Sequence, residues 1–215
     1  MLEKTANPKP LVAAGKINAI DVAILITRMW PRAILLHGQQ KPLTVGMMEL
    51  LVYSSYGCSF VFNGEKLFKE HFYAEDGSVK IPTVCSTFGY NSKALAKDLD
   101  TASATTLCVS AKDGFTGPQM QLVGSVTTGL CYYDEEHLRD LLLFSSDTYT
   151  DALSRNDHKI LPSDIKRDFS KMYNHANFGS FEEVFDFERS EEVNQFGYGG
   201  KYGYESTEEF MWGAI

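Results

Sequence analysis

Hydrophobic residues between positions 17 and 176 recur mostly at helical spacing, which predicts a series of helices. Asn18 is the predicted N-cap of the first helix, with Asp21 in the first turn, where the helix dipole favours a carboxylate. Apolar residues then cover most of the helix surface, which predicts a helix buried on most sides. Pro31 is expected to kink or end this helix, with residues 32–37 as a continuation.

The second predicted helix has the clearest start in the chain. Pro42 blocks a helix before this point, and Thr44 can cap a helix over residues 45–58, because its hydroxyl can accept a hydrogen bond from an orphan backbone N–H. Residues 59–62 fit either the tail of this helix or a short strand. One face of the helix is expected to be buried, and it carries Met47, Leu50, Leu51 and Ser54.

The middle of the chain has β-like patterns. Residues 66–73 and 79–84 are predicted to form short strands of a small sheet, and residues 105–111 alternate as a further strand. Residues 91–99 form a modest amphipathic helix pattern. Residues 120–126 fit either a strand or a helix.

Helical patterns return after this region. Asp134 is expected to cap a helix with leucines on its buried side, and Ser146 or Asp147 to start a short helix that runs through Leu153. Pro162 opens a further helix, and Ser180 begins a capping-box pattern. We therefore predict one α+β, mainly α domain, with five to seven helices around a helical core and a small β-sheet. The predicted divisions are a flexible N-terminal arm at 1–16, a globular domain at 17–176 and an acidic, aromatic-rich extension at 177–215.

Charge is distributed unevenly along the 215 residues. The net charge is −8, and residues 177–215 carry nine acidic against two basic side chains, so the body is nearly neutral. A nucleic-acid binder would carry a basic patch, so direct nucleic-acid binding is not expected. The sequence has no run of about 18 uninterrupted apolar residues, and its N-terminus lacks a secretory pattern. We expect a cytoplasmic protein with no membrane partner.

The residues that could carry chemistry form no recognisable motif. The four cysteines are 23 or 27 residues apart, whereas structural zinc sites use close pairs, so we expect neither a metal nor a cofactor. Cys58 and His71 could meet in space as a nucleophile and its base, although a small buried thiol beside a surface histidine is the alternative. We therefore predict no catalytic residues.

Aromatic residues are unusually frequent in the acidic C-terminal extension. Acidic tails that stay in solvent carry few aromatic residues, whereas interfaces favour them. The extension either folds back on the body or binds a partner, with Trp212 as the anchor in the second case. The predicted partner-binding residues are Tyr198, Tyr202, Tyr204, Phe210 and Trp212.

Residues 41–84 have a pattern that is similar to one family. A Leu-Thr pair precedes a leucine-rich helix, and motifs close to PLF, F-x-A-W and GPV follow it. The matching segments are Leu43-Thr44, Met47 to Tyr53, Lys66-Leu67-Phe68, Phe72-Tyr73-Ala74 and Gly77-Ser78-Val79 with Pro82 and Val84. This pattern resembles the SocA-like, or Panacea, antitoxin domain, which includes phage-associated GepA-like proteins. The resemblance covers roughly residues 18–90, with a weaker echo at 165–173. Glu75 replaces the family's Trp, Ser78 its Pro, and Glu49 stands near its Lys.

The resemblance implies a protein that binds other proteins. Members neutralise varied toxins by direct binding, and one works as an adaptor that presents its toxin to a protease. We therefore expect a non-enzymatic partner of a toxin or of a host factor, with a basic surface on the partner. One alternative is an enzyme of unknown class with a Cys/His site. Another is an acidic mimic that blocks a nucleic-acid-binding protein.

Overall fold

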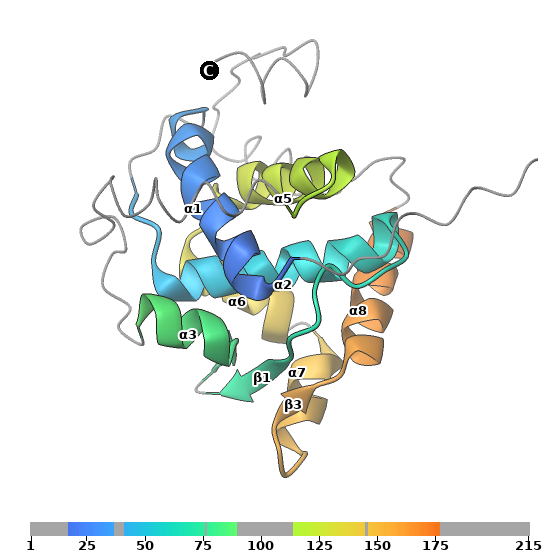
Figure 1. Ribbon diagram of the computed structural model, residues 1–215. Coiled ribbons are helices and arrows are strands. Elements are labelled where there is room, and N and C mark those ends of the chain that lie inside the picture. The colour runs from blue at the N-terminus through green and yellow to red at the C-terminus, as the bar shows by residue number, and fades with distance from the viewer. Residues whose placement is uncertain (1–16, 37–40, 76, 90–113, 145, 177–215) are drawn as a thin grey trace, which may run out of the picture.

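The computed structural model describes residues 17–36, 41–75, 77–89, 114–144 and 146–176. For residues 173–176 it describes the backbone alone. Helices surround a single central helix, and a small sheet lies at one side of it (Figure 1). The first half of the chain contributes α1 (Ala19–Leu36), α2 (Val45–Phe62), β1 (Phe72–Glu75), β2 (Ser78–Lys80) and α3 (Pro82–Phe88). The second half contributes α5 (Gly117–Leu130), α6 (Glu135–Arg139), the π-helical η2 (Asp140–Phe144), α7 (Asp147–Leu153), β3 (Lys159–Ile160) and α8 (Pro162–Ala176).

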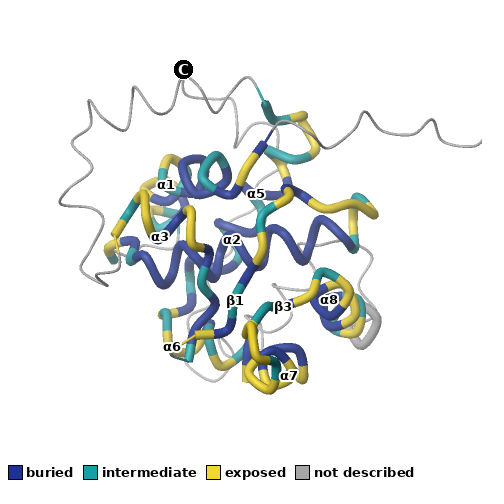
Figure 2. Tube along the Cα trace, turned by 60° about the horizontal axis from the view of Figure 1, so that its bottom comes forward, coloured by how far each residue is buried: buried dark blue, intermediate teal, exposed yellow. Residues whose placement is uncertain are grey.

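The central helix is α2, and every residue from Val45 to Phe60 is buried. It packs against α1, α5, α6, α8 and β2, and Figure 2 shows it as an almost continuous buried tube inside the body. By length and composition α2 could also cross a membrane, but 89% of it is buried inside the protein. Packing against neighbouring helices accounts for its apolar composition.

Two glycines let neighbours approach α2 closely. At Gly46 an added Cβ would lie 2.1 Å from Oε1 of Glu135, and at Gly57 it would lie 2.4 Å from the Phe169 ring. The carboxylate of Glu135 also accepts a hydrogen bond from the hydroxyl of Thr44, the N-cap of α2. A carboxylate is stabilised at this end of a helix because the helix dipole is positive there.

The sheet is antiparallel and has the order β2-β1-β3. Tyr73 pairs with Lys80 on one side and with Lys159 on the other. Burial alternates along β1, so Phe72 and Ala74 face the core while Tyr73 and Glu75 are more exposed. Phe72 lies edge-on to Tyr53 of α2, with ring centroids 5.2 Å apart. The sheet is therefore fixed to the central helix by aromatic packing.

An ionic network joins α7 to α8. Arg155 donates to Asp164 at 2.6 Å, and Arg167 contacts Asp164 and Asp168 at 3.4 and 3.2 Å. Asp168 in turn accepts from the backbone N–H of Thr148 on α7, at 3.3 Å. Because these groups bond to one another, the network explains how α7 is held on α8.

The predicted fold class is confirmed, since the described residues form a mainly helical structure with a small three-stranded antiparallel sheet. Leu50, Leu51 and Phe72 are all buried in one core cluster, as expected. The predicted caps at Asn18 and Asp134 are also present. The predictions for residues 1–16, 91–99, 105–111 and 177–215 lie outside the described residues.

The structure decides between alternatives that the sequence left open. Pro31 does not end α1, which continues to Leu36 with the buried residues Trp30 and Ala33 on either side of the proline. Residues 59–62 are the tail of α2, and residues 120–126 belong to α5. Two predicted strands had wrong boundaries. The strand expected at 66–73 begins only at Phe72. The strand expected at 79–84 ends at Lys80, because Pro82 occupies the first turn of α3, where its missing N–H costs no hydrogen bond.

Candidate functional site

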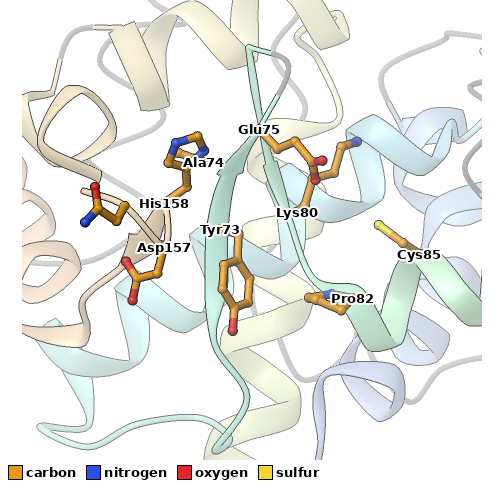
Figure 3. Close-up of a pocket in the computed structure, with 9 residues that line it drawn as sticks. Tyr73, Ala74, Glu75, Lys80, Pro82, Cys85, Asp157 and His158 are labelled. Carbon is orange, nitrogen blue, oxygen red and sulfur yellow. The ribbon is translucent and has the colours of Figure 1, made fainter. Parts of the chain in front are cut away.

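An open cavity of about 330 Å³ lies beside the sheet. Three separate parts of the chain form it: β1, the segment from β2 into α3, and the turn between α7 and β3 (Figure 3). Its lining residues are Tyr73, Ala74, Glu75, Lys80, Pro82, Cys85, Asn156, Asp157 and His158.

The wall on the β3 side is a well-defined turn. His158 has a φ of 50°, in the left-handed region that non-glycine residues rarely adopt. Its backbone carbonyl accepts a hydrogen bond of 2.8 Å from the N–H of Ala74, which continues the pairing of β1 with β3. Asp157 Oδ1 accepts from the backbone N–H of Lys159 at 3.1 Å. These bonds hold residues 156–158 against β1.

The inner side of the cavity contains a buried ionic cluster. Glu49 is fully buried on α2, and its Oε2 accepts from Nζ of Lys80 at 3.0 Å. Its Oε1 accepts from the thiol of Cys85 at 2.8 Å and from the backbone N–H of Ile81 at 3.2 Å. Every oxygen of this carboxylate therefore has a donor, and the three bonds tie α2 to the junction of β2 and α3.

These contacts shift the pKa values of the partners of Glu49. Burial, and then the hydrogen bond to Glu49, raise the pKa of the Cys85 thiol to about 12. Burial would lower the pKa of Lys80, but the hydrogen bond and the negative charge of Glu49 outweigh it, so the pKa of Lys80 is raised. At neutral pH the thiol is therefore protonated and the lysine is charged.

The outer side of the cavity has a different character. The carboxylate of Glu75 has no hydrogen-bond or ion-pair partner within the described part of the chain, and Asp157 has only its backbone contact. Both residues are exposed. The ammonium of Lys80 is bound to Glu49, so among the lining residues these two carboxylates are the acidic groups that face solvent.

The cysteine and histidine pair considered from sequence is unsuited to catalysis. Cys58 is buried in α2, and burial raises its pKa well above the ordinary value, so it stays a thiol. His71 is exposed, and slight burial together with the charges of Lys159 and Lys66 lowers its pKa. Among the described residues no hydrogen bond joins the two, and no group of three or more His, Cys, Asp or Glu side chains could hold a metal.

The predicted partner-binding residues lie outside the described residues, so their role stays a prediction. These are Tyr198, Tyr202, Tyr204, Phe210 and Trp212. The cavity was not predicted from the sequence. One signal was present, since Glu49 is the single charged residue in an otherwise apolar helix pattern, and a buried charge requires partners elsewhere in the chain.

No protein-family model, curated protein sequence or solved structure matches this chain.

Proposed function

We propose that this chain is a non-enzymatic protein that binds and neutralises another protein directly, as an antitoxin or as a phage-encoded modulator of a host factor. The observation that carries the proposal is the division of charge around the cavity. The groups with reactive potential, Lys80 and the Cys85 thiol, are bonded to the buried Glu49. The carboxylates of Glu75 and Asp157 instead face solvent, where they can meet a partner.

The thiols support binding over the enzyme alternative. A cysteine attacks as a thiolate, and catalytic cysteines have a lowered pKa in an electropositive, partly exposed setting. Cys58 and Cys85 have raised pKa values and are buried, and the Cys85 thiol donates a hydrogen bond to a carboxylate. Neither is prepared for nucleophilic attack.

The residues behind the resemblance to the Panacea family suit a framework role. Leu50, Leu51 and Phe72 lie in the core, where they determine packing. Partner choice would then depend on exposed positions, such as Glu75, where the family has Trp. This arrangement fits a family that uses one framework against varied partners.

The test is capture and neutralisation. Affinity purification of the full chain from its native host, followed by mass spectrometry, should recover one protein partner in near-stoichiometric amount. Co-expression should relieve the toxicity of that partner, or of a small toxic protein encoded by the adjacent gene. Leu50→Asp, which places a charge in the core, is the unfolded control. Absence of a specific partner together with absence of relief would contradict the proposal.

A second test of the proposed function concerns the C-terminal extension, residues 177–215. Truncation after Gln195 should leave the melting temperature unchanged and weaken partner binding, because Tyr198, Tyr202, Tyr204, Phe210 and Trp212 offer contact area. Trp212→Ala should cost roughly 2 kcal/mol or more in binding free energy if Trp212 is an anchor. A truncated protein that binds as well as the intact chain, or that melts much lower, would contradict this role.

A further inference from the structure

We propose that the exposed side of η2 and α7 binds a basic amphipathic helix of the partner protein, whose apolar stripe packs on Phe144 and Leu153 while its basic residues meet the carboxylates of α6, η2 and α7. This inference rests on the proposed function, because it specifies which surface of the chain binds the partner and what chemistry the partner presents. The surface is continuous with the cavity, since residues 156–158, in the turn after α7, line the cavity.

Two large apolar side chains are exposed on this surface. Phe144, the last residue of η2, keeps 59% exposure, and Leu153, the last residue of α7, keeps 44%. The Phe144 ring lies edge-on to the ring of Tyr149, with centroids 5.9 Å apart, and Tyr149 is one helical turn before Leu153 on α7. The three residues therefore form one apolar strip that is exposed at both ends. Contiguous exposed apolar surface of this kind marks interaction sites.

The π-helical geometry of η2 accompanies the exposure of Phe144. Leu142 and Leu143 are both buried in this wide turn, and Phe144 follows them on the outside. π-Helical turns are rare, and they occur frequently at functional sites. The exposed part of Phe144 contributes nothing to the core, so burial against another protein is where it would gain.

The surroundings of the strip are acidic. Residues 134–157 contain seven acidic side chains and two arginines, and both arginines are in ion pairs, Arg139 with Glu135 at 2.8 Å and Arg155 with Asp164 at 2.6 Å. The exposed carboxylates form two rows. One row leads to Phe144 at four-residue spacing, and the other follows the solvent side of α7, which Figure 2 shows as exposed; the rows consist of Glu136 and Asp140, and of Asp147 and Asp151. Of these, Asp151 has a weak, exposed ion pair with Arg167 at 3.5 Å.

This combination of charge and apolar surface selects the occupant. The chain's own extension, residues 177–215, has nine acidic against two basic side chains, so the acidic rows repel it. A purely apolar partner would remove water from carboxylates without pairing them. A basic amphipathic helix pairs the carboxylates and covers the strip, and its charge also speeds association.

The length of the strip agrees with a helix. The distance from Phe144 to Tyr149 is 5.9 Å between ring centroids, and the next helical turn to Leu153 adds about 5.4 Å. Apolar residues at i, i+3, i+4 and i+7 of a helix cover about 10 Å along its axis. One such stripe therefore spans the strip from end to end.

A peptide titration tests the inference directly. The probe is an acetylated and amidated peptide of about 14 residues, with leucines at i, i+3, i+4 and i+7 spacing and lysines elsewhere, added to the isotopically labelled full chain. One control peptide has the same composition with the leucines dispersed, and the other has glutamate in place of lysine. We expect saturable amide NMR shifts at Phe144, Tyr149 and Leu153, and binding of both control peptides weaker by about tenfold or more. Equal binding of the dispersed peptide, or shifts that spread without saturation, would overturn the inference.

Matched variants separate this surface from general attraction to an acidic protein. Phe144→Ser with Leu153→Ser removes the exposed ends of the strip, and Leu35→Ser with Phe62→Ser removes two exposed apolar side chains elsewhere. The first pair should weaken peptide binding about tenfold or more, and the second should leave it unchanged. Equal loss in both pairs would contradict the inference.

A charge pair tests the same surface with the strip intact, which covers the case in which the serine variants unfold. Asp140→Asn with Asp147→Asn should also weaken binding of the leucine–lysine peptide about tenfold, whereas Glu65→Gln with Glu75→Gln, two exposed carboxylates outside this surface, should not. Equal binding by the Asp140→Asn, Asp147→Asn chain would count against the inference. A wild-type dimer in sedimentation that Phe144→Ser with Leu153→Ser disperses would show that a second copy covers the strip, and would overturn it.

Partner capture distinguishes failure of this inference from failure of the proposed function. If the wild-type chain captures its partner and the Phe144→Ser, Leu153→Ser chain captures it equally well, the inference is wrong and the proposed function stands. If this variant loses capture while the Leu35→Ser, Phe62→Ser chain keeps it, both stand. If the wild-type chain captures no partner and relieves no toxicity, the proposed function fails whatever the peptide does.

Discussion

Glu49→Gln is the substitution that best tests how the cavity is built. The glutamine has the same size, and its carbonyl can still accept from the N–H of Ile81 and the thiol of Cys85, which both contact Oε1 in the wild type. Its NH₂ group would then face Nζ of Lys80, which lies 3.0 Å from Oε2. The variant therefore replaces an ion pair by two donors that point at each other.

The magnitude follows from burial. Removing one partner of a buried ion pair costs about 3–5 kcal/mol, because the other charge is left buried without compensation. The side chain of Lys80 keeps 23% exposure, so its ammonium can turn toward water, and the two bonds at Oε1 survive. We therefore expect Glu49→Gln to lower the free energy of unfolding by about 2–3 kcal/mol.

The reverse deletion should be more harmful. Lys80→Met leaves the carboxylate of Glu49 without its cation, and Glu49 has no exposed surface through which it could be rehydrated. Lys80→Met should therefore cost more than Glu49→Gln. In the double variant neither charge remains, so its loss should be smaller than the sum of the single losses by about 1 kcal/mol or more.

Urea unfolding followed by circular dichroism measures all of these values, with Glu136→Gln as an exposed control expected to stay within about 0.5 kcal/mol of wild type. The reasoning is refuted if Glu49→Gln is as mild as this control. It is also refuted if the single losses simply add, because Glu49 and Lys80 would then not interact across the base of the cavity.

Other parts of the structure give further predictions. Gly57→Ala should lower the free energy of unfolding, measured in urea, by about 1–2 kcal/mol, because the new methyl group would lie 2.4 Å from the Phe169 ring. This clash outweighs the gain in helix propensity of about 1 kcal/mol. In a Phe169→Leu background the same change should be neutral or stabilising. His158→Val should cost about 1–2 kcal/mol more than His158→Asn in urea, since the φ of 50° suits asparagine and opposes β-branching. Ser78→Ala should increase the free energy of unfolding by about 1 kcal/mol and so raise the melting temperature, because the Ser78 hydroxyl is buried without a hydrogen-bond partner among the described residues. Because the pKa of Cys85 is raised, the folded state keeps a thiol proton that the unfolded state loses above its ordinary pKa of 9.0. The stability that arises from this difference is intact below pH 9 and is lost as the pH rises toward 12. Urea midpoints should therefore fall less steeply over that pH range in Cys85→Ser than in the wild type.

The sequence was most informative where one segment decides its own structure. Thr44 and Asp134 cap their helices through local hydrogen bonds, and both caps were predicted. The apolar surface of α2 predicted a core helix, although a single buried face was expected and the helix is buried on all sides. That difference arises because β2, α6 and α8 cover the side of α2 that the pattern left open, and their positions are set by contacts far along the chain.

Proline shows why local reading fails at boundaries. The ring prevents a hydrogen bond from its own nitrogen, so Pro31 was expected to kink or end a helix, and Pro82 was included in a predicted strand over residues 79–84. Pro31 lies inside α1, because buried neighbours hold the helix on both sides of it. Pro82 lies in the first turn of α3, where an N–H has no partner in any case. The same residue thus has opposite meanings, and tertiary packing decides between them.

The cavity could not be predicted, because the wall formed by residues 156–158 meets β1 through the pairing of β1 with β3, and β3 consists of two residues with no strand pattern. What the sequence did offer was Glu49, a charge within an apolar helix. A buried carboxylate demands donors, and the fold supplies them from Lys80, Ile81 and Cys85. This demand explains the inner side of the site, because the ammonium of Lys80 is engaged by Glu49 and the carboxylates of Glu75 and Asp157 are the exposed acidic groups of the lining.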